Sequence, residues 1–140
     1  MRLSCAIFAI ALLLSGCEEP PVGTPMDPRS VTAPRSTWPA AVANANDAPP
    51  HILALWLNST SISPGVEWRG RIATTTNVAS LEIRTESFSF NATRIAYGQF
   101  VFDQHVLDIV PQYKRGYTLN VIARNSAGVE DARLIPIELH

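Results

Sequence analysis

The side chains best suited to metal or acid–base chemistry are three histidines and a few acids near residue 105. The histidines are His51, His105 and His140, and Asp103 stands two positions before His105, so both would share one face of a strand. Asp108 follows closely. A zinc site needs three or four ligands in fixed geometry, and the sequence fixes no third ligand here. We therefore expect a solvated loop edge at this place, with no metal and no cofactor.

The usual signatures of nucleophilic catalysis are missing from the sequence. It contains no Gly-x-Ser-x-Gly motif and no glycine-rich phosphate loop, and no cysteine follows residue 17. Residues 51–140 carry eight basic and eight acidic side chains, so no basic field is present to attract nucleic acid. The sequence thus predicts a protein that is not an enzyme and does not bind nucleic acid.

The amino terminus has the features of a secretory signal. Arg2 supplies a positive charge, and residues 6–14 form an unbroken apolar run of nine residues. Such a run has the length of a signal-peptide core and is too short to span a bilayer as a helix. The tetrapeptide Leu14-Ser15-Gly16-Cys17 follows this run and resembles the bacterial lipobox at every position.

The lipobox resemblance implies acylation of the Cys17 thiol and removal of residues 1–16 as a lipoprotein signal peptide. Two or more acyl chains on Cys17 would anchor the protein stably, whereas one chain binds a membrane only marginally. The partner would then be a bacterial membrane of the cell envelope, and Glu18 after the cysteine favours the outer membrane. The alternative is an ordinary secretory signal in which Cys17 occurs by chance.

Residues 17–50 are predicted to form a lipidated cysteine followed by a disordered, Pro-rich tether. Residues 18–50 hold eight of the eleven prolines and show neither helical nor alternating periodicity. Such a segment buries too little apolar surface to offset its ordering entropy, so an extended chain is expected. Trp38 lies within it and is a speculative binding residue. It could dock on the domain, contact a partner or remain solvated.

Residues 51–140 are predicted to form one all-β domain. Short runs rich in Val, Ile, Phe, Tyr and Thr alternate with turn signals, and no stretch has a helical period. About seven strands in 90 residues indicate an antiparallel, immunoglobulin-like β-sandwich. The expected strands cover residues 51–57, 66–74, 78–84, 87–90, 99–102, 117–124 and 129–139, with Pro136 indicating an edge or a bulge.

The run from Tyr117 to Gly128 resembles the penultimate strand and turn of fibronectin type III, PKD and related immunoglobulin-like domains. Its sequence follows their pattern Tyr-x-Leu/Val-x-Val-x-Ala-x-Asn-x-x-Gly. The resemblance implies that the Tyr117 hydroxyl caps a nearby backbone group, as in a tyrosine corner. Trp68, on the second strand, is expected in the core, where it fills volume that a disulfide would otherwise occupy. The resemblance implies little about function, because these sandwiches serve many roles.

Trp56 is the main speculative binding residue of the domain. If Leu53, Leu55 and Leu57 face the core, Trp56 and Ala54 face outward, and an exposed tryptophan could contact a protein or a glycan. Alternatively, Ile52, Ala54 and Trp56 form the buried face, or the tether covers Trp56. The sequence does not distinguish these alternatives.

Three functions are compatible with these features to different degrees. The first is a lipid-anchored, non-catalytic module that binds an envelope protein or a glycan. The second is a structural accessory subunit that positions a larger envelope complex. The third, a small hydrolase or metal-dependent enzyme, would need a cleft of convergent polar groups that the sequence does not indicate.

Overall fold

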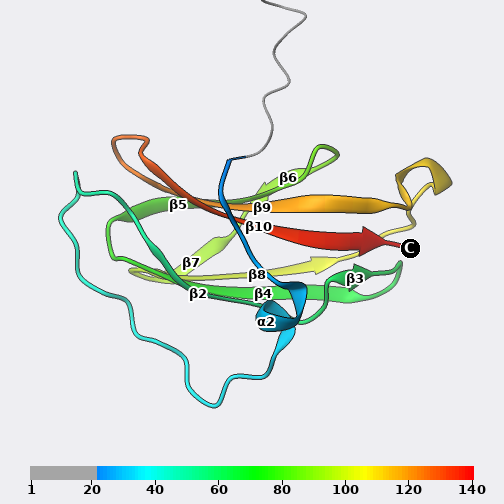
Figure 1. Ribbon diagram of the computed structural model, residues 1–140, viewed down its shortest axis with the longest axis horizontal. Coiled ribbons are helices and arrows are strands. Elements are labelled where there is room, and N and C mark those ends of the chain that lie inside the picture. The colour runs from blue at the N-terminus through cyan, green and yellow to red at the C-terminus, as the bar shows by residue number, and fades with distance from the viewer. Residues whose placement is uncertain (1–21) are drawn as a thin grey trace, which may run out of the picture.

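Two β-sheets packed face to face form the body of the computed structural model, which describes residues 22–140 (Figure 1). The elements in chain order are β1 (Thr24–Pro25), α2 (Pro28–Thr32), β2 (Ile52–Leu57), β3 (Ser61–Ile62), β4 (Glu67–Thr74), β5 (Val78–Arg84), β6 (Ser89–Asn91), β7 (Thr93–Ala96), β8 (Gln99–His105), the 3-10 turn η1 (Pro111–Tyr113), β9 (Gly116–Asn125) and β10 (Glu130–Leu139).

The strand order is that of an immunoglobulin-like sandwich. One sheet has six strands in the order β1-β10-β9-β5-β6, with β3 also pairing with β10, and the other has four in the order β2-β4-β8-β7. The four-stranded sheet corresponds to A-B-E-D, and β10-β9-β5 corresponds to G-F-C. All pairings are antiparallel except those of β1 and β3, which run parallel to β10. The predicted fold class is therefore confirmed, and β7 is a strand that the prediction lacked.

Alternation along β4 determines which residues fill the space between the sheets. Trp68, Gly70 and Ile72 are buried, while Glu67 and Arg69 are exposed, as expected for a strand with one covered face. Gly70 has a specific role, because a Cβ there would overlap the ring of Phe102 on the neighbouring strand β8. A glycine at this position lets the Phe102 ring occupy the space that a Cβ would take.

The prediction that Trp68 is a core residue is confirmed. The side chain is 3% exposed, and its ring meets three phenylalanines edge-on, at centroid distances of 5.0 Å to Phe102 and 6.1 Å to both Phe88 and Phe90. The indole N–H donates to the Ser59 carbonyl at 3.1 Å. Edge-to-face aromatic packing thus fills this end of the sandwich without a disulfide.

The tyrosine corner implied by the family resemblance is also present. The Tyr117 hydroxyl donates to the carbonyl of Tyr113, four residues upstream, at 3.0 Å. Pro136 lies at a local edge of β10, between the residues that pair with β1 and those that pair with β3. The Leu134 carbonyl accepts from the N–H of Met26, the residue after β1, and the Glu138 N–H donates to the Thr60 carbonyl beside β3. The nitrogen of Pro136 therefore faces the gap between β1 and β3. No carbonyl group of a described neighbouring strand lies there, so the absence of an N–H donor on proline breaks no hydrogen bond of the sheet.

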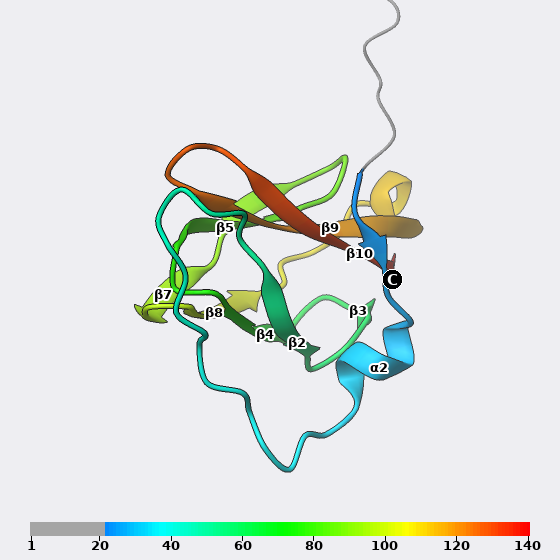
Figure 2. The ribbon, with the colours of Figure 1, turned by 60° about the vertical axis from the view of Figure 1, so that its left-hand side comes forward.

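In residues 22–50, the structure differs from the predicted free tether, because this segment packs along the sandwich. We call residues 22–50 the strap. β1 adds to the edge of β10, α2 covers β2, and the chain then passes along the outside of the four-stranded sheet before entering β2 (Figure 2). Val31 of α2 is 0% exposed and belongs to the hydrophobic core, and Met26 packs against it.

The strap is ordered by contacts that its composition does not reveal. Asp27 caps α2 by accepting from the Arg29 N–H at 2.8 Å, and Pro28 occupies the first turn, where prolines are tolerated. Further along, the Ala48 carbonyl accepts from the side-chain amides of Asn77 and Asn125 at 2.7 and 3.0 Å. Local caps and long-range backbone bonds thus replace the secondary structure that the prolines prevent.

Candidate functional site

The two speculative binding residues, Trp38 and Trp56, lie on the outer face of the four-stranded sheet. Trp56 on β2 pairs directly with Arg71 on β4, and both point outward because their neighbours Leu55 and Ile72 are in the core. The register of β2 against β4 shifts between Ile52 and Ala54. The residues that face the core therefore follow one of the two predicted alternations before the shift and the other after it.

Neither register predicted for β2 holds over the whole strand, and the side chain of Trp56 is partly buried. Ile52, Leu55 and Leu57 face the core, whereas Leu53 is 38% exposed. Ala54 points outward and is nevertheless buried, as is its cross-strand partner Ala73. The strap passes the sheet at this level, because Trp38 binds Gln99, the cross-strand partner of Ala73 on β8.

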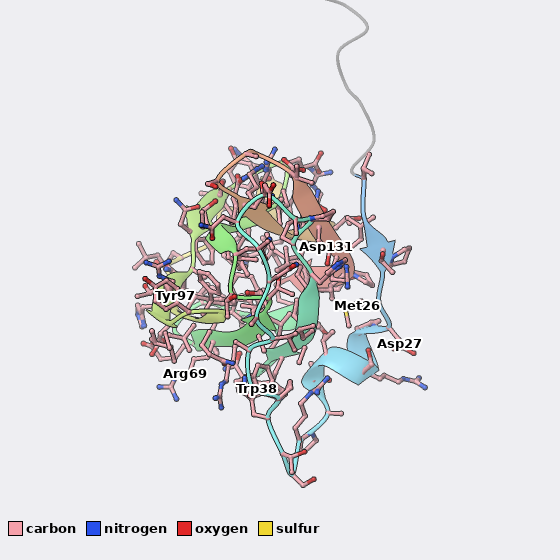
Figure 3. All side chains as sticks on the ribbon, turned by 90° about the vertical axis from the view of Figure 1, so that its left-hand side faces the viewer. Met26, Asp27, Trp38, Arg69, Tyr97 and Asp131 are labelled. Carbon is pink, nitrogen blue, oxygen red and sulfur yellow. The ribbon has the colours of Figure 1, made fainter. Side chains whose placement is uncertain are left out.

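Trp38 docks on this face from the strap. Its indole N–H donates to Gln99 Oε1 on β8 at 2.9 Å, and Gln99 Nε2 donates to the Pro39 carbonyl at 3.3 Å. Of the three possibilities left by the sequence, docking on the domain is the one that the structure shows. In Figure 3, Trp38 lies outside the four-stranded sheet, and Arg69 lies farther along the same side.

Two guanidinium groups lie over the Trp38 ring. The Cζ atom of Arg71 is 4.6 Å from the ring centroid, and that of Arg35, also in the strap, is 5.5 Å from it. The two cations are therefore at most about 10 Å apart, and among the described residues neither forms an ion pair with a carboxylate. We call the set Arg35, Trp38, Trp56, Arg71 and Gln99 the tryptophan face.

Asp103 and His105 both interact with side chains of β4. Asp103 accepts from Arg69 Nε at 3.3 Å, and His105 Nδ1 lies 2.7 Å from Glu67 Oε1. Asp103 and His105 do share one face of β8, but each pairs with a different residue across the strand. Within residues 22–140, no three His, Cys, Asp or Glu side chains come together in a group that could hold a metal ion.

The outer face of the six-stranded sheet carries charges that are already paired. Glu82 accepts from Arg124 at 2.6 Å, from Arg84 at 2.9 Å and from Ser89 at 2.8 Å, and Arg124 also donates to Glu130. Burial alone would raise the pKa of Glu82, but the hydrogen bonds from two arginines and a serine outweigh it and lower this pKa from 4.5 to about 2. The bonds to two carboxylates raise the pKa of Arg124.

A groove of about 890 Å³ lies beside this network, over the ends of β9 and β10. Its lining is mixed, with polar residues that include Thr60, Ser61, Arg84, Glu86, Thr118, Asn120 and Glu138, and apolar residues that include Pro28, Pro136 and Ile137. The Arg84 and Glu86 side chains bind Glu82 and Arg115 at 2.9 and 2.6 Å. Asn120 Oδ1 is buried in this groove without a hydrogen-bond partner among the described residues. Arg84 and Glu86 are thus paired with opposite charges, whereas the cations of the tryptophan face have no acid beside them in the described part of the chain.

Cys17, the predicted lipidation site, lies outside the described residues, as do the predicted signal peptide and Glu18. In the described part of the chain, no helix has the length and apolar character needed to cross a membrane.

The sequence indicated both tryptophans of the face but missed Arg35, Arg71 and Gln99. Arg71 had a usable signal, because its outward position on β4 follows from the alternation that buries Gly70 and Ile72. For Arg35 and Gln99, the sequence contains no comparable signal. Their position depends on the docking of the strap, which the proline content concealed.

Strand order and tyrosine corner together define the class of this protein as an immunoglobulin-like β-sandwich. Its sequence matches no protein-family model and no curated protein. Among solved structures, the chain is similar to the fibronectin(III)-like modules of CbhA from Clostridium thermocellum, with a TM-score of 0.33 and 11% sequence identity over 59% of this chain and 94% of that chain. The fold assignment accordingly rests on the strand order.

Proposed function

We propose that this protein is a lipid-anchored, non-catalytic binding module of the bacterial envelope, and that it binds through the tryptophan face. The observation that carries the binding role is the pair of partly buried tryptophans around Arg71, which has no described acidic partner. Tryptophan and arginine are the residues most enriched at binding hot spots. The lipid anchor is supported by the lipobox around Cys17.

The docked strap changes how the anchored domain would be held. With the strap packed on the sandwich, only residues 18–23 connect Cys17 to β1. Six residues span at most about 20 Å when fully extended, whereas a free tether of 33 residues could reach about 100 Å. The module would therefore stay close to the bilayer surface.

The anchor can be tested by metabolic labelling with radioactive palmitate and by membrane fractionation. The Cys17→Ser variant is expected to lose the label and the processing step and to leave the membrane fraction. Cys5→Ser is the matched control, because it removes the other cysteine of the chain and should label normally. A Cys17→Ser protein that is still labelled and still pelleted with membranes would overturn the anchor.

The binding role can be tested by cross-linking in intact cells, followed by purification and mass spectrometry. Trp56→Ala is expected to remove the cross-linked partners while the domain remains folded. If the partners persist in a folded Trp56→Ala variant, the tryptophan face is not the binding surface.

A structural accessory role is the second candidate, and one feature favours it. β7 is the outer strand of its sheet, and all four of its residues are exposed, including Ile95 at 58%. Tyr97, in the turn that follows β7, is 70% exposed. Such an edge can accept a strand from another subunit. This role predicts stable co-purification with a membrane complex that Ile95→Lys abolishes and Trp56→Ala leaves intact.

A further inference from the structure

We infer that the tryptophan face binds an acidic polysaccharide, with a sugar ring on Trp56 and a ring carboxylate on Arg71. This inference rests on the proposed binding function and names its ligand class.

The two arginines of the tryptophan face favour the binding of an anion. Five other arginines of the described chain each pair with a carboxylate, namely Arg69, Arg84, Arg115, Arg124 and Arg133. The other four described arginines form no ion pair with a described carboxylate. Two of them are Arg29 and Arg94, and Arg94 lies over Tyr97. The remaining two, Arg71 and Arg35, lie together over one indole ring. Two like charges at this separation repel each other, and an anion bound next to them removes the repulsion.

The guanidinium of Arg71 is held in place before a ligand arrives. It stacks on Trp38, and Trp38 is itself fixed by its hydrogen bond to Gln99 and by the bond from Gln99 to Pro39. A stacked guanidinium loses less side-chain freedom on binding than a free one. Its N–H groups match the two oxygens of a carboxylate, which gives short, charge-assisted hydrogen bonds.

The spacing of Trp56 and Arg71 fits a sugar that carries its own carboxylate. The two residues are direct cross-strand partners on β2 and β4, so their Cβ atoms are about 5 Å apart. Two long side chains that start this close together can contact a pyranose ring and the carboxyl group attached to it at the same time. The apolar C–H face of the sugar would cover the partly exposed indole of Trp56.

The location of the face favours a polymer over the lipid headgroups of the anchoring membrane. Gly23, six residues after Cys17, lies against Ala132 of β10 in the six-stranded sheet. The tryptophan face is on the outer side of the other sheet, where Figure 3 shows Trp38. A connection of about 20 Å leaves the face pointing away from the bilayer, and a chain with a net charge of −1 has no general attraction to anionic lipid.

The test is calorimetric titration of the purified, lipidated protein in neutral detergent with oligogalacturonate, a polymer of sugar carboxylates. Neutral galactan is the matched polymer without the carboxylates. The unmodified protein is expected to bind oligogalacturonate about tenfold or more tightly than galactan, with an affinity that falls as salt is added.

Arg71→Gln should weaken oligogalacturonate binding by about tenfold or more, and Trp56→Ala should weaken it similarly. The control is Arg69→Gln, because Arg69 lies on the same strand and face but is paired with Asp103. It should change the affinity by less than about twofold. Circular dichroism checks folding, and Arg71→Lys, which keeps the charge but loses the two-pronged contact, is used if Arg71→Gln does not fold. It too should bind several-fold more weakly.

Equal binding of oligogalacturonate and galactan, or equal losses in Arg69→Gln and Arg71→Gln, would overturn the inference. So would Arg71-dependent binding to phosphatidylglycerol vesicles without binding to oligogalacturonate. These failures are distinct from failure of the proposed function, which is decided by palmitate labelling and by the Trp56-dependent cross-links in cells.

Discussion

A substitution of one buried residue, Val31, tests whether the strap is part of the folded domain. Val31 is 0% exposed and is the one buried residue of a five-residue helix, and an isolated helix of that length is unstable in water. Val31→Ala removes two buried methyl groups and leaves a small cavity, which together cost about 2 kcal/mol of the free energy of unfolding. Because the strap closes onto β2 and β10, this loss should appear in the global stability of the sandwich.

The assay is equilibrium urea denaturation of the mature protein. A loss of about 2 kcal/mol lowers the midpoint by about 1 M for a typical urea dependence. Val22→Ala is the control, because Val22 is 81% exposed, and its effect should stay within about 0.5 kcal/mol. Hydrogen exchange provides a second readout at the Met26 amide, which donates to Leu134 at 2.8 Å.

A free tether would behave differently in both experiments. If Val31→Ala and Val22→Ala have the same midpoint, and if the Met26 amide exchanges at the rate of an unprotected chain, the strap is not part of the folded unit. The placement of Trp38 and Arg35 on the outer face would then fail as well, because both residues belong to the strap.

Three further substitutions test the core and the charge network. Trp68→Ala should lower the free energy of unfolding by about 3–5 kcal/mol, measured by urea denaturation, and a midpoint near that of the unmodified protein would exclude a core role. Gly70→Ala should cost about 1–3 kcal/mol, because the new Cβ overlaps Phe102, and the same measurement should show no loss if the ring can move aside. Glu82→Gln should cost about 2–3 kcal/mol at pH 7. Since the pKa of Glu82 is lowered from 4.5 to about 2, its contribution is complete above about pH 4.5 and disappears as the pH falls towards 2. The difference between Glu82→Gln and the unmodified protein should therefore shrink over that interval, and a difference that is independent of pH would refute the network's role.

The strands were predictable where their burial alternates. β4 and β9 have one covered face, so their apolar residues recur at every second position. β7 was missed because all four of its residues are exposed, which leaves no alternation to detect. β2 was ambiguous because the register shift after Ile52 changes which residues face inward, and such a shift depends on the neighbouring strand rather than on the residues of β2 alone.

The sequence by itself determined the sandwich, the core position of Trp68, the tyrosine corner at Tyr117 and the edge position of Pro136. Each of these follows from local pattern, such as alternation, a family motif or a residue that cannot donate a hydrogen bond. Only the tertiary structure decided that residues 22–50 pack on the sandwich and which residues make up the tryptophan face. The strap is ordered by partners more than 20 positions away in the chain, such as Asn77 and Gln99, and contacts over that separation leave no mark in local composition.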